Sequence, residues 1–298
     1  MPVTAVAFLG LGAIGRPMAA RVAARFPLTL WNRTGSRAVQ LAGETGARAA
    51  STPREAVQGV PIVVTCLPTS AEVEALLDGP DGILAGLAPG ALLVDCTSGD
   101  PATSRRIAAR LGALGFGFID APVSGGTNGA EAGTLTVMVG GDPALFDRAA
   151  PVLSAFGSRI VRMGPVGSGH AMKAVNNALL AVNILSVGEG LAALVKAGVP
   201  AATALSVLNA SSGRSFVSET LVPDRVMTGA FPKTFKLTLL QKDAGIAAGL
   251  LDETGVSGPV IDLAHHLYGN ARAVLGDDAD YLEAIKVIEA QAGVEIRA

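Results

Sequence analysis

Three glycines near the start of the chain have the spacing that a bound diphosphate requires. They follow the apolar run 3–9 and lead into the Ala-rich run 14–24. In a strand–turn–helix unit the first glycine permits a tight turn, the second lets the backbone approach a pyrophosphate, and the third lets helix and strand pack closely. The helix N-terminus then offers free N–H groups to the anion. The pattern predicts a dinucleotide-binding turn, the alternative being a glycine-rich turn without a ligand. Its six residues are Gly10, Leu11, Gly12, Ala13, Ile14 and Gly15.

The residues after the second apolar run indicate which dinucleotide to expect. An NAD site usually has an acid about 20 residues after the glycines, to bind the ribose 2′-hydroxyl. Here the run 28–31 ends in Asn32, Arg33 and Thr34, without an acid. A guanidinium pairs well with a phosphate dianion, and its polar neighbours can donate or accept beside it. We therefore predict NADP, with NAD as the second choice; the alternative for Arg33 is a solvated surface side chain.

A second glycine-rich stretch could bind a carboxylate. Ser124, Gly125 and Gly126 follow the apolar run 117–120. A Ser-Gly-Gly sequence can expose several backbone N–H groups with little steric cover, which suits an anion. The alternative is a plain turn.

A single lysine stands out in the second half of the chain. The sequence has six lysines and none precedes Lys173, which lies in an otherwise apolar helical stretch. Asn177 is four residues later and therefore on the same helix face. A lysine in such surroundings is costly unless it is paired or functional, and an ammonium can polarise a carbonyl and supply a proton. The alternative is a surface lysine whose stem lies along the helix. His170, one turn earlier, is interpreted as a polar residue of the helix N-terminus; the alternative is a residue that tunes Lys173.

The elements that must hold these residues follow from hydrophobic patterning. Short apolar runs that do not alternate are typical of strands buried on both faces of a parallel sheet. Their alternation with helical stretches predicts a doubly wound α/β fold. The predicted strands are 3–9, 28–31, 61–66, 91–96, 117–120, 135–140 and 159–163.

The pattern changes after residue 163, where only helical spacing remains. Helices are predicted near 169–196, 201–210, 234–254, 258–274 and 279–291. The Gly/Pro-rich stretch 164–169 separates an N-terminal Rossmann domain, 1–163, from an all-α domain, 164–298. Polar residues interrupt the helix 169–196, so we interpret it as a buried helix between domains or subunits rather than a membrane span.

Composition excludes several classes of protein. Half of the residues are hydrophobic, 16% are charged and the net charge is −2. This composition excludes a disordered chain and offers no basic patch for nucleic acid or a membrane. Two cysteines build no disulfide framework, no metal-binding motif is present, and no signal peptide is recognised, so a reducing cytoplasm is expected. Cys66 and Cys96 are interpreted as small buried hydrophobes.

Five motifs in order resemble the β-hydroxyacid dehydrogenase family, and 3-hydroxyisobutyrate dehydrogenase most closely within it. The motifs are FLGLGAIGRPMA, DAPVSGGTNGAEAGTL, GPVGSGHAMKAVNN, NASSGRS and QKDAGIA, and they span nearly the whole chain. The resemblance implies that Lys173 is catalytic and that Ser124, Gly125, Gly126 and Asn177 hold the substrate. It also implies that Leu67, Pro68, Glu72, Ser98 and Lys242 contact the cofactor and that Phe235 lines the pocket. Glu72 departs from the family, which often has a neutral side chain there.

The resemblance implies reversible hydride transfer between a small 3-hydroxy acid and its semialdehyde, in a domain cleft. It also implies self-association to a dimer or tetramer, and, for 3-hydroxyisobutyrate, a place in valine catabolism. Three alternatives stay open. A reductase of glyoxylate, succinic semialdehyde or tartronate semialdehyde would share every motif. A non-catalytic relative or an imine reductase would typically lack the lysine.

Overall fold

The computed structural model describes residues 4–298. The chain divides into two units, the first ending at Lys173 and the second beginning at Ala174. This division falls within one long helix, α8 (Ser168–Lys196). We describe each unit by itself.

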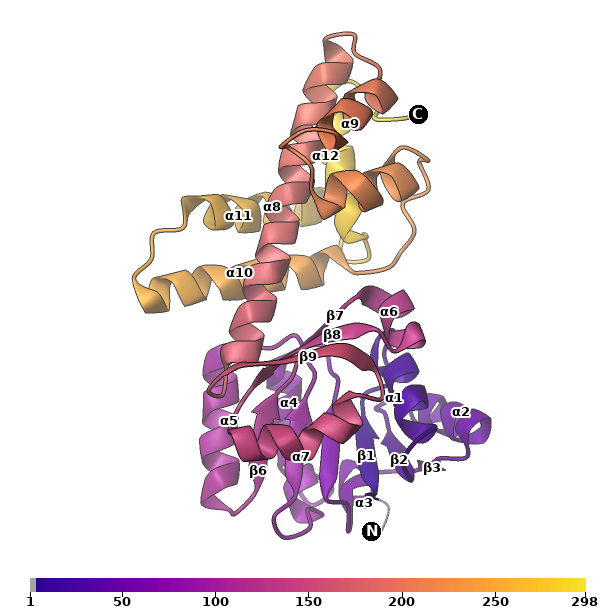
Figure 1. The fold of residues 1–298 in the computed structure, drawn as a ribbon, viewed down its shortest axis with the longest axis vertical. Helices are drawn as coiled ribbons and strands as arrows, with labels where there is room; N and C mark the ends of the chain where they lie inside the picture. The colour runs from indigo at the N-terminus through magenta and orange to yellow at the C-terminus, as the bar shows by residue number, and fades with distance from the viewer. Residues whose placement is uncertain (1–3) are drawn as a thin grey trace. The chain divides into compact units, whose positions relative to one another are not determined.

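The first unit is built on a nine-stranded sheet with helices on both faces (Figure 1). The strand order is β3-β2-β1-β4-β5-β6-β8-β7, with β9 paired to β8, and the strands from β3 to β6 are parallel. The carboxyl ends of these parallel strands therefore all lie on the same side of the sheet, and ligands bind beyond these ends in folds of this kind. The strands are β1 (Val6–Leu9), β2 (Leu28–Trp31), β3 (Arg48–Ala49), β4 (Ile62–Thr65), β5 (Leu92–Asp95), β6 (Gly117–Asp120), β7 (Val123–Ser124), β8 (Leu135–Gly140) and β9 (Gly157–Gly164).

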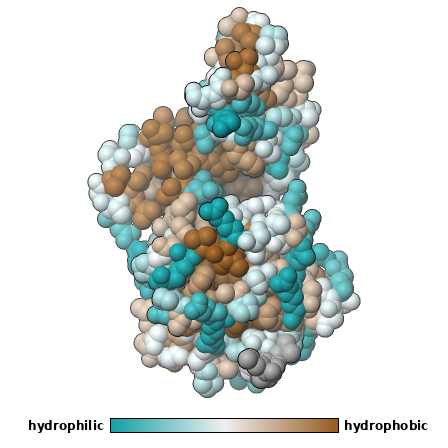
Figure 2. All heavy atoms as spheres, in the orientation of Figure 1, coloured by the Kyte–Doolittle hydropathy of each residue, from teal (hydrophilic) through white to brown (hydrophobic). Residues whose placement is uncertain are grey.

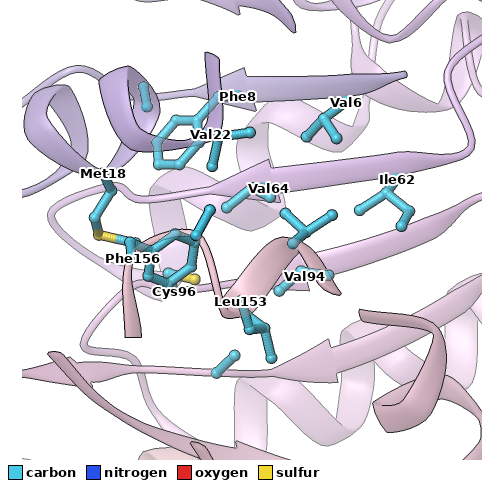
Figure 3. Close-up of a cluster of buried hydrophobic side chains, with 14 of the residues drawn as sticks. Val6, Phe8, Met18, Val22, Ile62, Val64, Val94, Cys96, Leu153 and Phe156 are labelled. Carbon is cyan, nitrogen blue, oxygen red and sulfur yellow. The ribbon is translucent and has the colours of Figure 1, made fainter. Parts of the chain in front are cut away.

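Successive residues of each buried strand point to opposite faces of the sheet, which creates two cores. Val6 and Phe8 of β1 pack with Met18 and Val22 of α1 on one face (Figure 3). Ala7 and Leu9 belong to the core on the other face. This is why the strands read as continuous apolar runs. The helices of this unit are α1 (Gly15–Ala23), α2 (Gly35–Thr45), α3 (Pro53–Val57), α4 (Ser70–Leu77), α5 (Pro101–Ala113), α6 (Gly126–Ala132) and α7 (Pro143–Leu153), with a 3₁₀ turn η1 (Ile83–Ala85).

The sheet differs from the prediction in two ways. The two-residue strands β3 and β7 were not expected, because they are too short to give a hydrophobic pattern. The sheet is also mixed rather than parallel throughout, since β8 is antiparallel to β6 and β7. Residue 3 of the first predicted strand lies outside the described residues.

The second unit is helical, as predicted. Its core draws on several helices, with the fully buried Tyr268 of α11 among its large side chains. The segment Val217–Val226, a π-helical stretch with Pro223 inside it, was not predicted. The helices are α8, α9 (Ala201–Asn209), α10 (Leu237–Thr254), α11 (Pro259–Leu275) and α12 (Ala284–Ala292), the last preceded by a 3₁₀ turn η3 (Tyr281–Glu283).

Among residues 4–298, α8 alone is long and apolar enough to pass a length-and-composition test for a membrane span. In its most apolar window 44% of the residues are buried inside the structure. The core helix of a folded domain passes the same test, so length and hydropathy do not separate the two roles.

Candidate active site

The three glycines of the first turn meet the steric requirements of a dinucleotide site. Gly10 has φ +102°, and a Cβ there would lie 2.3 Å from the Cys66 carbonyl oxygen. A Cβ on Gly15 would lie 2.1 Å from the Gly10 carbonyl oxygen, whereas a Cβ on Gly12 would meet no atom within 4 Å. The backbone is therefore tightly packed behind the turn and open beside its middle glycine. No side chain caps the N-terminus of α1. Within its first turn the Arg16 N–H donates to the Gly12 carbonyl oxygen at 3.0 Å, and Pro17 has no N–H. The start of α1 therefore offers a diphosphate chiefly the positive end of the helix dipole.

Asn32, at the end of β2, holds this turn in place. Its Oδ1 accepts a hydrogen bond of 2.9 Å from the Leu11 N–H, and its Nδ2 donates to the Thr34 carbonyl oxygen at 3.0 Å. The side chain expected beside a phosphate thus also ties the glycine turn to the residues after β2.

Arg33 extends from the same end of β2, and its side chain is 86% exposed. A guanidinium nitrogen lies 3.7 Å from Oε1 of Glu72. The other Glu72 oxygen, Oε2, accepts from the N–H and hydroxyl of Thr69, which forms a capping box at the start of α4. The structure therefore brings together Arg33 and Glu72, a cation and a fixed carboxylate that were predicted separately.

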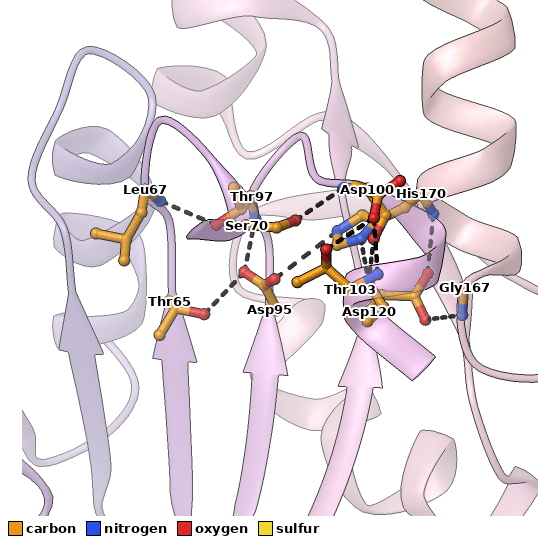
Figure 4. A network of polar contacts seen from close by, with 11 residues as sticks. Thr65, Leu67, Ser70, Asp95, Thr97, Asp100, Thr103, Asp120, Gly167 and His170 are labelled. Carbon is orange, nitrogen blue, oxygen red and sulfur yellow. Dashed lines mark hydrogen bonds and ion pairs between the residues drawn. The ribbon is translucent and has the colours of Figure 1, made fainter. Parts of the chain in front are cut away.

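A buried polar network joins the ends of β4 and β5 (Figure 4). Oδ1 of Asp95 accepts from the Thr65 hydroxyl at 2.9 Å and from the Thr97 N–H at 3.1 Å. The Thr97 hydroxyl oxygen accepts from the Leu67 N–H at 3.1 Å. Sequence reasoning missed Thr65, Asp95 and Thr97, although each stands at or just after the polar end of an apolar run. They position the segments that carry Leu67, the exposed Pro68 and the half-buried Ser98.

A second buried carboxylate, that of Asp120 at the end of β6, accepts hydrogen bonds from the backbone at the start of α8. Its two oxygens accept the N–H groups of Gly167 at 2.7 Å and His170 at 2.8 Å. Burial raises the pKa of Asp120, and His170 and these two N–H groups act in the opposite direction. His170 lies in the first turn of α8, as the sequence indicated, and its side chain is fully buried.

The expected carboxylate loop has the backbone that its glycines suggest. Ser124 ends β7, and Gly125 and Gly126 follow with φ +135° and +67°. A Cβ on Gly125 would lie 3.0 Å from a methyl carbon of Leu135. Both glycines are exposed and Ser124 is half-buried, so the loop can present backbone N–H groups to an anion.

Lys173 lies on α8, three residues after His170, and is only 9% exposed. This burial argues against the alternative of a solvated surface lysine. A buried ammonium is poorly hydrated and acts strongly on any oxygen placed beside it.

Asn177 and Lys242 converge on an aspartate within the second unit. The Asn177 Nδ2 donates to Oδ2 of Asp243 at 2.6 Å, and the Lys242 Nζ lies 3.0 Å from Oδ1. Asp243 is 1% exposed and was missed as a site residue. The available signal was an acidic residue next to Lys242 on an apolar helix. Its carboxylate fixes the Asn177 amide, whose Oδ1 accepts from Asn176 at 3.1 Å.

Phe235 lies at the edge of the second unit's core. Its ring packs edge-on against Tyr281, with centroids 5.7 Å apart, and its N–H donates to Asp280 at 3.0 Å. These contacts fix the position of the ring, which is partly buried.

Both cysteines are free thiols at the ends of β4 and β5. Burial raises the pKa of Cys66 to about 12 and that of Cys96 well above its ordinary value, and the nearby Asp95 adds to both effects. Because the thiolate is the nucleophile, we expect the folded protein at pH 8 to react with iodoacetamide far more slowly than the unfolded protein. Mass spectrometry over time measures this difference, and rapid stoichiometric labelling of the folded protein would contradict it.

No group of three or more His, Cys, Asp or Glu residues between residues 4 and 298 is placed to hold a metal ion.

Two family models match the chain in order. Residues 5–164 match the NAD-binding domain of 6-phosphogluconate dehydrogenase, and residues 167–288 match the NAD-binding domain of NADP-dependent 3-hydroxyisobutyrate dehydrogenase. These matches cover both the glycine turn and the lysine-bearing helix.

Characterised relatives match over nearly their whole length. A 2-(hydroxymethyl)glutarate dehydrogenase of Eubacterium barkeri is 35% identical over 98% of this chain and 97% of its own. An NAD-dependent L-serine dehydrogenase of Pseudomonas aeruginosa is 39% identical over 88% of this chain and 90% of its own. The structure of Mycobacterium tuberculosis 3-hydroxyisobutyrate dehydrogenase with L-serine is 31% identical and has a TM-score of 0.88, covering 96% of this chain and 99% of that one. The resemblance inferred from the motifs is thereby confirmed: the chain belongs to the β-hydroxyacid dehydrogenases, NAD(P)-dependent oxidoreductases of CH–OH groups that include 3-hydroxyisobutyrate dehydrogenase.

Proposed function

We propose that this enzyme catalyses the reversible oxidation of a small 3-hydroxy acid to its semialdehyde, with NADP as cofactor and 3-hydroxyisobutyrate as the preferred substrate. The observation that carries the proposal is the buried Lys173 in the family's lysine motif on α8. A non-catalytic relative or an imine reductase would be expected to lack this lysine.

Separate groups of residues would bind the cofactor and the substrate. The glycine turn and the α1 N-terminus would hold the diphosphate, Arg33 the 2′-phosphate, and the residues after β4 and β5 the rest of the dinucleotide. When bound, the nicotinamide supplies the hydride acceptor. Ser124, Gly125 and Gly126 would hold the substrate carboxylate through hydroxyl and backbone N–H groups.

Lys173 would bind the reacting oxygen. In oxidation its amine accepts the hydroxyl proton; in reduction its ammonium stabilises the developing alkoxide and returns the proton. Asn177, oriented by Asp243 at 2.6 Å, would donate to the same hydroxyl. Lys242, which Asp243 also pairs, would bind the cofactor.

The named substrates of the relatives suggest a common chemistry. 3-Hydroxyisobutyrate, L-serine and 2-(hydroxymethyl)glutarate are all 3-hydroxypropanoates that differ in the substituent on C2. A site built on a carboxylate loop and a lysine would serve all three, so the C2 substituent decides between them. The NASSGRS motif favours 3-hydroxyisobutyrate and therefore a role in valine catabolism.

A panel of substrates tests the reaction. The three 3-hydroxy acids should be assayed with NADP and with NAD, and glyoxylate, succinic semialdehyde and tartronate semialdehyde with the reduced cofactors. We expect the highest kcat/KM with 3-hydroxyisobutyrate and NADP. A higher value for one of the aldehydes would replace this proposal by the reductase alternative, which Arg33 also favours because it suits NADPH.

We also propose that the chain self-associates in the cytoplasm through its helical unit. Large apolar side chains of this unit are exposed, including Val260 and Leu263 of α11 at 61% and 60%, and Figure 2 shows hydrophobic surface over α10 and α11. Homomeric interfaces are large and apolar, and closed symmetric dimers and tetramers are the common forms.

Light scattering at micromolar concentration tests the assembly. The chain has a mass of 29.9 kDa, so symmetric closure predicts a particle of about 60 kDa for a dimer or about 120 kDa for a tetramer. A particle of one chain's mass would refute self-association.

A further inference from the structure

His170 is a fully buried histidine that the proposed chemistry does not use. It belongs to the first turn of α8, and its ring lies among the ends of β5 and α5 (Figure 4). A Cβ added to Gly99 would lie 2.6 Å from the ring's Cε1 atom. The imidazole is therefore packed directly against the backbone after β5, with no room for a side chain between them.

The ring's two nitrogens meet different partners. Nδ1 lies 2.6 Å from the hydroxyl oxygen of Ser104 on α5. Nε2 has no hydrogen-bond partner and lies 3.9 Å from Oδ2 of Asp95. The single proton of the Ser104 hydroxyl donates to the Asp100 carbonyl oxygen at 3.0 Å. The hydroxyl oxygen is therefore placed to accept from an Nδ1–H of the ring. Among residues 4–298, the contact with Ser104 is the hydrogen bond that fixes the ring.

The backbone of the same turn is held as well. Asp120 accepts the N–H groups of Gly167 and His170, and a Cβ on Gly169 would lie 2.2 Å from the Met138 carbonyl oxygen. Asp120 and Gly169 fix where the turn lies. The side chain of His170 reaches farther from the helix axis than these backbone contacts, and its contact therefore adds a restraint on the rotation of the turn.

We propose that His170 is a positioning residue for Lys173, acting through its Nδ1 contact with Ser104. Residues three apart on a helix are neighbours on its surface, so a ring fixed on α5 sets the direction in which the lysine stem leaves α8. The network that continues from Asp95 through Thr97 to Leu67 relates that direction to the segments proposed to hold the cofactor. This inference rests on the proposed catalytic role of Lys173.

Two replacements of the ring separate its nitrogens. The amide of His170→Asn can occupy the Nδ1 position, whereas that of His170→Gln reaches the Nε2 position. We expect His170→Ala to lower kcat about tenfold, because displacing a catalytic group by about 1 Å costs up to about 100-fold. The dissociation constant of NADP should change less than twofold. His170→Asn should recover most of kcat, and His170→Gln should not.

Ser104→Ala removes the partner without touching α8. We expect it to lower kcat about as much as His170→Ala, and the double variant to be no worse than either single variant, since all three lose one contact. Arg110→Gln, on the exposed face of α5, is the matched control and should behave as the wild type. Rates are divided by the concentration of NADPH sites, measured by fluorescence titration, so that a fraction of unfolded protein does not count as lost kcat.

Three results would overturn the inference: wild-type kcat in Ser104→Ala, multiplicative losses in the double variant, or recovery by His170→Gln alone. If Lys173→Ala itself keeps wild-type kcat, the proposed function fails instead. The two failures are therefore distinguishable.

Discussion

Replacing Lys173 by alanine is expected to abolish turnover and to leave NADP binding nearly unchanged. Loss of a general acid–base typically lowers the rate by about 10²–10⁴-fold, and the buried ammonium also stabilises the alkoxide. Because the proposed diphosphate site lies at the glycine turn and α1, the dissociation constant of NADPH should stay within about twofold, a shift well below the 1.4 kcal/mol of a tenfold change. Steady-state kinetics and fluorescence titration measure the two effects separately.

Two further variants make this result specific. Lys173→Met keeps most of the buried stem and removes only the charge, so it should lose as much activity as Lys173→Ala. Lys196→Ala removes a lysine from the other end of α8, where its Nζ donates to the Ala292 carbonyl oxygen at 2.8 Å; it should retain the wild-type rate. Wild-type kcat in Lys173→Ala would end the catalytic assignment.

Replacing Arg33 by alanine is expected to weaken NADP binding and to leave NAD binding little changed. Only the 2′-phosphate depends on this cation, and a charge-assisted hydrogen bond contributes about 1.5–3 kcal/mol, or about 10- to 100-fold in affinity. The side chain is 86% exposed, so salt screens the interaction and the lower end of this range is expected at physiological ionic strength. Titration of the enzyme with each dinucleotide in low and high salt checks both points.

Glu72 provides the reciprocal test. Its carboxylate lies 3.7 Å from Arg33 and would repel a phosphate placed there. Glu72→Gln keeps a side chain suited to the capping box at Thr69, so it should bind NADP at least as tightly as the wild type. Arg54→Ala, on α3, is the control for loss of an exposed arginine. Equal weakening of NADP and NAD in Arg33→Ala would instead make Arg33 a residue that stacks on adenine or supports the fold.

The local features of this protein were predictable from its sequence. A dinucleotide turn needs glycines at fixed spacing within six residues, and the structure gives Gly10 a positive φ and Gly12 open space. Buried strands, helices and a lysine on an apolar helix face are also short-range patterns, set by side-chain periodicity. The family resemblance rested on the same short motifs. Strands of two residues and the antiparallel placement of β8 have no such local pattern, which is why the sequence did not predict them.

Only the tertiary structure decided which polar side chains meet. Asn32 accepts from Leu11 across 21 residues, Asp120 from His170 across 50, and Asp243 from Asn177 across 66. In the sequence, Asp120 is only an acidic residue at the end of an apolar run, and Asp243 is only an acidic residue within a predicted helix. The partner of each is set by strand order and helix packing, which depend on contacts between distant segments. Burial then makes the pairing necessary. An unpaired charge or amide in the interior costs free energy that is large compared with the small net free energy of unfolding of a domain.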